Sequence, residues 1–174
     1  AIHNPVDYMN TKKEAMEREY SNKVILSVGR LTQMKGFRRV PAMAARLREK
    51  YPKLSFQWLI VGEGEQRSLI EAEIEKWNVE DTVRLLGHIE DVSEFYEKAL
   101  LYVMTSEYEG LPMVLLEAKM HHLPCVSFDI KTGPSEIIQD GKDGYLIPYE
   151  TEKDYSEDMV DAIAAYHDTG LVVD

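Results

Sequence analysis

Short, continuous apolar runs alternate with amphipathic stretches along most of this chain, and this alternation constrains the fold more than any other feature. The runs have the length of strands and cover residues 24–28, 56–61, 83–86, 100–104, 124–128 and 144–147. Runs of Val, Ile and Leu are typical of strands that are buried on both faces of a parallel sheet. Several intervening stretches, such as 37–51, repeat apolar residues at helical spacing. The pattern predicts a doubly wound, Rossmann-like α/β domain with a mostly parallel sheet of about six strands.

Length, charge and cysteine content narrow the class of protein. The 174 residues suffice for one domain with a hydrophobic core and are too few for two full-sized domains. The formal net charge of −11 argues against a surface that binds nucleic acid or anionic membrane, because most of it would repel phosphate. The single cysteine, Cys125, lies in an apolar run, which predicts a buried thiol in a reduced, cytoplasmic protein. No apolar run approaches the ~20 residues of a membrane helix.

The turns that contain glycine do not match the common nucleotide-binding motifs. The turn after the first strand, residues 29–36, lacks the G-x-G-x-x-G pattern of dinucleotide-binding domains, and the turn after the second strand has Arg67 in place of the third glycine. Lys35 precedes Gly36, which excludes a P-loop. The histidines show no zinc-ligand spacing, and no serine lies in a G-x-S-x-G elbow. We therefore predict no metal site.

Two carboxylates eight positions apart mark the segment after the fourth strand. Glu109 lies in a loop, and Glu117 lies about a turn and a half into the following helix, which Pro112 is well placed to open. The free N–H groups of a helix N-terminus can bind phosphate, and carboxylates accept hydrogen bonds from sugar hydroxyls. This combination suits a nucleotide-sugar. Each acid alone would also fit an ordinary loop position or a favourable contact with the helix dipole.

A basic turn follows the first strand. Arg30 could donate two hydrogen bonds to phosphate oxygens, and Lys35 could act as a point charge. Taken alone, the pair fits a solvated basic turn better than a binding site. However, the carboxyl ends of parallel strands meet at one edge of a sheet, where ligands of such folds bind. We therefore expect this turn to lie close to the segment that carries Glu109 and Glu117.

These motifs, in this order, resemble the C-terminal, donor-binding domain of the GT-B glycosyltransferases of family 4, also called group 1. The resembling segments are 27–31 with 35–36, 61–64, 86–87, 109–118, 124–126, 133–136, 140–141 and 143–144. The resemblance extends over about residues 4–148. It implies that residues 21–168 form a nucleotide-sugar-binding, Rossmann-like domain, one half of a GT-B fold. Residues 1–20 would then be an interdomain hinge and polar lead-in.

The resemblance implies a role for each candidate site residue. Arg30 and Lys35 would hold the donor diphosphate and offset charge as the nucleotide leaves, and Glu109 would orient a hydroxyl of the transferred sugar. These three are the catalytic candidates. Glu117 would hold the ribose hydroxyls, and the amides of residues 111–114 would help to bind the diphosphate. The implied donor-binding set is Gly29, Arg30, Lys35, Gly62, His88, Glu109, Gly110, Leu111, Pro112, Met113, Val114 and Glu117.

The activity implied by the resemblance is transfer of a hexose-type sugar from a nucleotide-diphosphate sugar to a glycan or lipid-linked acceptor. Family members usually retain the anomeric configuration and need no metal, and the sequence has no D-x-D metal motif. A UDP-sugar is the expected donor because it is frequent in the family, and no cofactor is expected. The loop at residues 86–89, which includes His88, would lie against the base.

In this family an N-terminal domain carries the acceptor and a catalytic side chain, and we find no such domain in this sequence. We therefore expect the chain to bind the donor and, by itself, to transfer little or no sugar. The parent enzyme would be cytoplasmic or peripheral at the inner face of the membrane, with no membrane or nucleic-acid contact through this chain. Two alternatives are a non-catalytic nucleotide-sugar-binding module and another GT-B activity, such as sugar-nucleotide epimerisation.

The chain departs from the family pattern at two turns. Family members often have Ala-x-Gly before the fifth strand, where this chain has His121-His122-Leu123. If that turn needs a positive φ, His122 adopts it at a cost of ~1 kcal/mol. The loop that follows the fifth strand, usually Gly-Gly, reads Thr132-Gly133-Pro134-Ser135.

Overall fold

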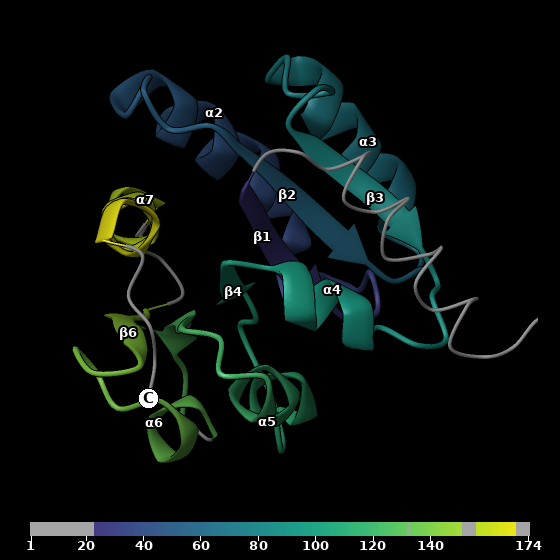
Figure 1. The fold of residues 1–174 in the computed structure, drawn as a ribbon. Helices are drawn as coiled ribbons and strands as arrows, with labels where there is room; N and C mark the ends of the chain where they lie inside the picture. The colour runs from purple at the N-terminus through teal and green to yellow at the C-terminus, as the bar shows by residue number, and fades with distance from the viewer. Residues whose placement is uncertain (1–22, 132, 151–155, 170–174) are drawn as a thin grey trace, which may run out of the picture.

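The computed structural model of the protein describes residues 23–131, 133–150 and 156–169, and a six-stranded sheet forms its centre (Figure 1). Along the sheet the order is β3-β2-β1-β4-β5-β6, and every neighbouring pair is parallel. The strands are β1 (Lys23–Val28), β2 (Phe56–Val61), β3 (Val83–Gly87), β4 (Leu101–Met104), β5 (Cys125–Asp129) and β6 (Gly144–Pro148). This is the predicted doubly wound fold, and each end of each strand lies within one residue of its expected position.

Helices cover both faces of the sheet. They are α2 (Val40–Lys50), α3 (Arg67–Lys76), α4 (Ser93–Lys98), α5 (Met113–Met120), α6 (Pro134–Ile137) and α7 (Ser156–Thr169), with short 3-10 turns η1 (Gln33–Lys35) and η2 (Phe37–Arg39). Helix α2 contacts α3 and α7, whereas α4 packs on β1 and α5 packs on β4 and β5 (Figure 1). Residues 151–155, which precede α7, lie outside the described residues, as does the lead-in at 1–20.

Helix α2 shows how the chain accommodates a proline inside a helical pattern. The two 3-10 turns after β1 end at Arg39, so α2 begins at Val40 and Pro41 falls in its first turn. A first-turn N–H has no intrahelical partner, and its absence from proline therefore removes no hydrogen bond. From there Val40, Ala44 and Leu47 are buried on one face, as their spacing predicts.

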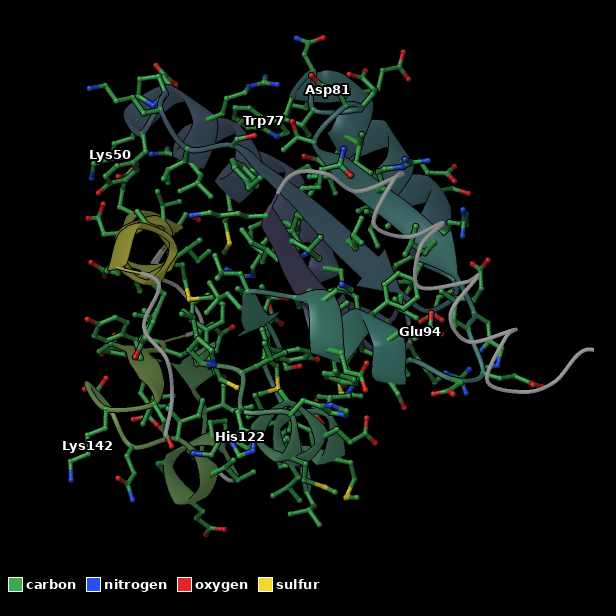
Figure 2. The ribbon with its side chains drawn as sticks, viewed as in Figure 1. Lys50, Trp77, Asp81, Glu94, His122 and Lys142 are labelled. Carbon is green, nitrogen blue, oxygen red and sulfur yellow. The ribbon has the colours of Figure 1, made fainter. Side chains whose placement is uncertain are left out.

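Helix α7 packs on the sheet mainly through apolar side chains. Met159, Val160 and Ile163 are fully buried. At the surface, Lys50 of α2 donates to Asp161 of α7 at 2.7 Å (Figure 2). This hydrogen bond raises the pKa of Lys50 and lowers that of Asp161. Because both side chains are exposed, the pair contributes little compared with the buried apolar area.

Strands β1 and β4 are paired for only part of their length. The ladder joins Ile25 to Leu101 and Leu26 to Tyr102, and it stops before the carboxyl ends. Side-chain hydroxyls replace it there: Tyr102 Oη accepts from the amide of Val28 and donates to its carbonyl, both at 3.1 Å. Ser27 Oγ donates to the carbonyl of Val103 at 2.6 Å. Side-chain hydrogen bonds thus join the two strands where the backbone ladder between them has ended.

The turn between α5 and β5 adopts the predicted strained conformation. His122 has φ 59°, and its amide donates to the carbonyl of Lys119 at 2.9 Å (Figure 2). The ring of His121, the C-cap residue of α5, stacks on the ring of Tyr96 with 5.3 Å between ring centroids. The prediction for Cys125 is also confirmed, since its thiol is buried and burial raises its pKa to about 12. The thiol therefore remains protonated at neutral pH and is a poor nucleophile.

Candidate functional site

The order of the strands places the candidate site between β1 and β4. The chain reverses the direction in which it adds strands at this pair, and in open α/β sheets ligands bind outside the carboxyl ends of the strands at such a switch point. The loop after β1, residues 29–36, and the loop after β4, residues 105–112, both leave the sheet here. They carry most of the predicted donor-binding residues.

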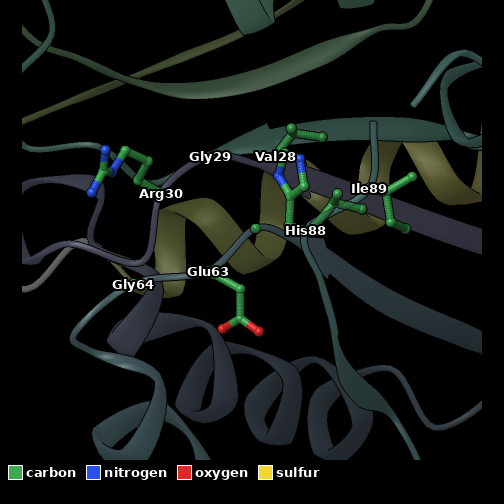
Figure 3. Close-up of a pocket in the computed structure, with 9 residues that line it drawn as sticks. Val28, Gly29, Arg30, Glu63, Gly64, His88 and Ile89 are labelled. Atoms are coloured by element: carbon green, nitrogen blue, oxygen red, sulfur yellow. The ribbon is translucent and has the colours of Figure 1, made fainter. Parts of the chain in front are cut away.

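A cleft of about 580 Å³ lies at the carboxyl ends of β1, β2 and β3 (Figure 3). Arg30 stands at one end of it, and His88 and Ile89 stand at the other. The complete lining is Val28, Gly29, Arg30, Val61, Gly62, Glu63, Gly64, His88 and Ile89. Four predicted donor-binding residues, Gly29, Arg30, Gly62 and His88, are therefore brought together.

The floor of the cleft is main chain. The amide of Gly29 donates to the carbonyl of Val61 at 3.0 Å, and the amide of Gly62 donates to the carbonyl of Gly87 at 2.8 Å. Gly62 has φ 148°, and a Cβ placed on it would overlap the carbonyl oxygen of Gly29. Only glycine fits this position, because a side chain would both strain the backbone and push the ends of β1 and β2 apart.

Lys35 and Glu109 form an ion pair beside this cleft. Nζ of Lys35 donates to Oε1 of Glu109, and Ser106 Oγ donates to the same oxygen at 2.8 Å. The Glu109 side chain is only 9% exposed and that of Lys35 only 25%. The aliphatic part of Lys35 passes Gly29, since a Cβ on Gly29 would lie 3.5 Å from Cδ of Lys35. The predicted diphosphate cation and the predicted sugar ligand are thus direct neighbours at the edge of the cleft.

Hydrogen bonds to main-chain carbonyls join the two loops that carry this pair. Thr105 Oγ1 donates to the carbonyl of Lys35 at 2.9 Å, and the amide of Glu107 donates to the carbonyl of Met34 at 2.8 Å. Gly36 has φ 69°, and a Cβ there would overlap the carbonyl oxygen of Thr105. The close approach of the loops therefore depends on glycine at position 36.

The next two cations of the basic turn are held in structural contacts. Arg38 and Arg39 both donate to Oε1 of Glu107, at 3.1 and 2.5 Å. The guanidinium of Arg39 also lies over the rings of Phe128 and Tyr149, 5.7 and 5.8 Å from their centroids. These contacts tie the start of α2 to the loop after β4 and to β5 and β6.

Pro112 is the residue that immediately precedes α5. It has φ −79° and ψ 83°, is buried, and its carbonyl accepts from the amide of Leu115 at 3.0 Å. Leu111 and Met113 are exposed, 65% and 54%, and the amide of Met113 donates to the carbonyl of Leu111 at 2.9 Å. Gly133, from the loop that departs from the family pattern, packs against the Pro112 ring. Helix α5 thus begins four residues after Glu109; Pro112 has no N–H, and the amide of Met113 is already bonded within the turn.

Glu117 is half-buried on α5 and faces α4. Burial raises the pKa of the Tyr96 hydroxyl, and the negative charge of Glu117 raises it further. Tyr96 in turn stacks on Tyr102, with 5.9 Å between centroids. Tyr102 is hydrogen-bonded to Val28 at the end of β1, so two rings connect Glu117 to that strand end, but Glu117 does not line the cleft described above.

A second, smaller cavity of about 230 Å³ lies on the other side of Glu109. It is bounded by residues 107–109 and 149–150, which follow β4 and β6, and by residues 129–131 at the end of β5. Its walls combine acidic side chains with two tyrosines, Tyr108 and Tyr149. Glu109 therefore stands between this cavity and Lys35.

The sequence did not identify all the residues that shape the site. The sequence assigned no role to Thr105, Ser106 and Glu107, and the structure places each in a contact that positions Lys35 or Glu109. The contacts of Thr105 and Glu107 join segments about 70 residues apart in the sequence, so no local sequence pattern could indicate them.

The described residues contain neither a metal-ligand cluster nor a membrane-spanning helix. No three His, Cys, Asp or Glu side chains in that part of the chain lie close enough together to hold a metal ion. None of the helices that the structure describes is long and apolar enough to span a bilayer.

Comparison with known proteins identifies the family. The family model described as glycosyl transferases group 1 matches residues 9–167. The amylovoran biosynthesis glycosyltransferase AmsD of Erwinia amylovora is 39% identical over 141 residues, which are 81% of this chain and 38% of AmsD. The GtfA subunit of the UDP-N-acetylglucosamine–peptide N-acetylglucosaminyltransferase of Streptococcus gordonii is 32% identical over 82% of this chain and 27% of its own length.

A solved structure of a related protein also matches the fold of this chain. A mutant of S. aureus TarM, crystallised with fondaparinux, alpha-GlcNAc-glycerol and UDP, superposes with a TM-score of 0.79 at 31% identity. The match includes 87% of this chain and 29% of the TarM chain. The chain thus spans well under half the length of the relatives that it matches. It belongs to the glycosyl transferases group 1 family, and its sheet and flanking helices form a Rossmann-like domain of the GT-B glycosyltransferase fold.

Proposed function

We propose that this chain is the donor-binding part of a retaining, metal-independent glycosyltransferase that transfers a hexose-type sugar from a UDP-sugar to a glycan or lipid-linked acceptor. The observation that carries the proposal is the convergence of Arg30, Lys35 and Glu109 with the N-terminus of α5 at the edge where β1 and β4 separate. A cationic pair, a helix N-terminus and a carboxylate are what a diphosphate joined to a sugar requires.

The proposed roles follow from the charge that develops as the glycosyl–phosphate bond breaks. The sugar becomes positively charged and the departing nucleotide gains negative charge, which Arg30 and Lys35 would offset. Loss of one well-placed donor to developing charge typically costs ~2.7–4 kcal/mol of barrier stabilisation. Glu109 would accept a hydrogen bond from a sugar hydroxyl and Glu117 from the ribose. The cleft that ends at His88 and Ile89 has room for the base.

The names of the relatives support UDP as the nucleotide. GtfA is named for transfer from UDP-N-acetylglucosamine, and the TarM structure contains UDP. AmsD is named for the biosynthesis of a polysaccharide, which supports a glycan acceptor. Retention of configuration and independence from metal rest on the family resemblance alone.

Because the chain matches 27–38% of these relatives' lengths, we propose that the acceptor site lies elsewhere in a longer parent protein. Residues 21–168 would be the donor domain, and residues 1–20 would be the hinge that joins it to the acceptor domain. On this proposal the parent enzyme works in the cytoplasm or at the inner face of the membrane. The chain alone would bind the donor and transfer little or no sugar.

A panel of nucleotides tests the proposal. UDP, GDP, ADP and uridine would each be added to the chain, and the midpoint of thermal unfolding would be measured over a range of concentrations. At a hundredfold excess over its dissociation constant, a ligand should stabilise the fold by ~2.7 kcal/mol. We expect UDP to raise the midpoint most and uridine, which lacks the phosphates, to raise it least. If no nucleoside diphosphate shifted the midpoint more than uridine, the proposal would be wrong.

A further inference from the structure

We infer that Glu109 competes with the donor diphosphate for Lys35, so that the site holds UDP less tightly than it otherwise would and discriminates between the intact donor and the spent nucleotide. This inference rests on the proposed function and adds a second role for Glu109 to that of orienting the sugar. It starts from the observation that the cation assigned to the phosphate and the acid assigned to the sugar are bound to each other.

The ion pair is fixed from both sides. On the acid side, Ser106 is 2% exposed and its hydroxyl donates to the same carboxylate oxygen that Lys35 contacts. On the cation side, the carbonyl of Lys35 accepts from Thr105, and Gly36 packs directly on the Thr105 carbonyl. The acid is therefore positioned through its carboxylate and the lysine through its main chain, unlike a surface ion pair between two unsupported side chains.

Limited exposure makes the pair an effective competitor. With Glu109 only 9% exposed, water screens its attraction for Lys35 less than at an open surface. A diphosphate that binds Lys35 must separate the ammonium group from this carboxylate. The contacts between the two loops limit how far the loops can move to lower the cost of that separation. Breaking the ion pair costs free energy, and this cost makes the binding of the diphosphate weaker.

The intact donor and the spent nucleotide differ in what they offer Glu109. A sugar hydroxyl can donate a hydrogen bond to the carboxylate, which replaces Lys35 as its partner. UDP has no such hydroxyl near the outer end of its diphosphate. When UDP binds, Glu109 therefore loses Lys35 as a partner, gains no hydroxyl in its place, and lies close to the negative charge of the phosphate. The same contact therefore weakens the binding of the product more than that of the donor, which favours release of UDP after transfer.

The test is calorimetric titration of the chain with UDP, comparing wild type with Glu109→Gln. Glutamine retains an oxygen for Ser106 but has no charge to hold Lys35. We expect Glu109→Gln to bind UDP about three- to tenfold more tightly, the range expected for loss of a partly buried ion pair. Titration with UDP-N-acetylglucosamine should show a smaller gain or a loss. The matched control is Asp129→Asn, which removes one charge from the same second cavity without a contact to Lys35.

A double variant separates competition from simple repulsion between the acid and phosphate. If Glu109 acts by occupying Lys35, the gain from Glu109→Gln should be smaller in the Lys35→Ala background than in wild type. A gain that is equal or larger in that background, or no gain in wild type, would overturn the inference while leaving UDP binding intact. If neither wild type, Asp129→Asn nor Glu109→Gln binds UDP, the proposed function itself is wrong, and the inference fails with it.

Discussion

Gly62→Ala is expected to destabilise the fold by about 3 kcal/mol or more, the largest effect that we predict for a single methyl group. The added Cβ would overlap the carbonyl oxygen of Gly29, and the nearest atoms to it all belong to the main chain of Gly29. These atoms cannot rotate away as a side chain can. The residue must also keep φ 148°, which L side chains rarely adopt. Urea denaturation followed by circular dichroism would measure the change.

Gly110→Ala is the matched control. A Cβ on Gly110 meets nothing within 4 Å, and its backbone needs no positive φ. The free energy of unfolding should therefore change by less than about 0.5 kcal/mol. If Gly62→Ala were as stable as Gly110→Ala, the ends of β1 and β2 would not be packed as described.

Lys35→Ala is expected to remove most of the stabilisation that UDP gives to the chain. A charged hydrogen bond to phosphate contributes roughly 1.5–3 kcal/mol, so the variant should bind UDP about 10- to 100-fold less tightly. At a UDP concentration that stabilises wild type by ~2.7 kcal/mol, a hundredfold weaker site would give only about 0.4 kcal/mol. Thermal unfolding with and without UDP would measure both values.

Arg30→Ala and Lys50→Ala complete this experiment. Arg30 lines the cleft and should behave as Lys35 does. Lys50 lies on α2 and pairs with α7, and its variant should respond to UDP as wild type does. Equal stabilisation of wild type, Arg30→Ala and Lys35→Ala would contradict the roles assigned to the two cations.

The fold could be predicted because the sequence patterns that indicate its strands and helices are local. A run such as 56–61 has no polar alternation, and it can be buried on both faces only in a sheet that is covered by helices on both sides. The positive φ of His122 could also be anticipated, because a turn that usually holds glycine restricts the backbone whatever surrounds it. Helix α6, with four residues, is too short to show a helical period and was not predicted.

The sequence could not show how the side chains of the candidate site contact one another. The sequence placed Lys35 and Glu109 at one edge of the sheet, but their contact joins residues 74 positions apart and depends on how closely two loops approach. That approach is set by Gly36, Thr105 and the main chain of Glu107, whose contacts are tertiary. For the same reason the sequence could not show that Arg38 and Arg39 are engaged by Glu107.

The central claim is that the edge between β1 and β4 binds a nucleoside diphosphate, and a crystal structure of the chain with UDP tests it most directly. We expect the diphosphate within hydrogen-bonding distance of Arg30 and Lys35 and beside the N-terminus of α5, with the base in the cleft near Ile89. A complex with the diphosphate bound on another face, away from Lys35 and Glu109, would contradict it.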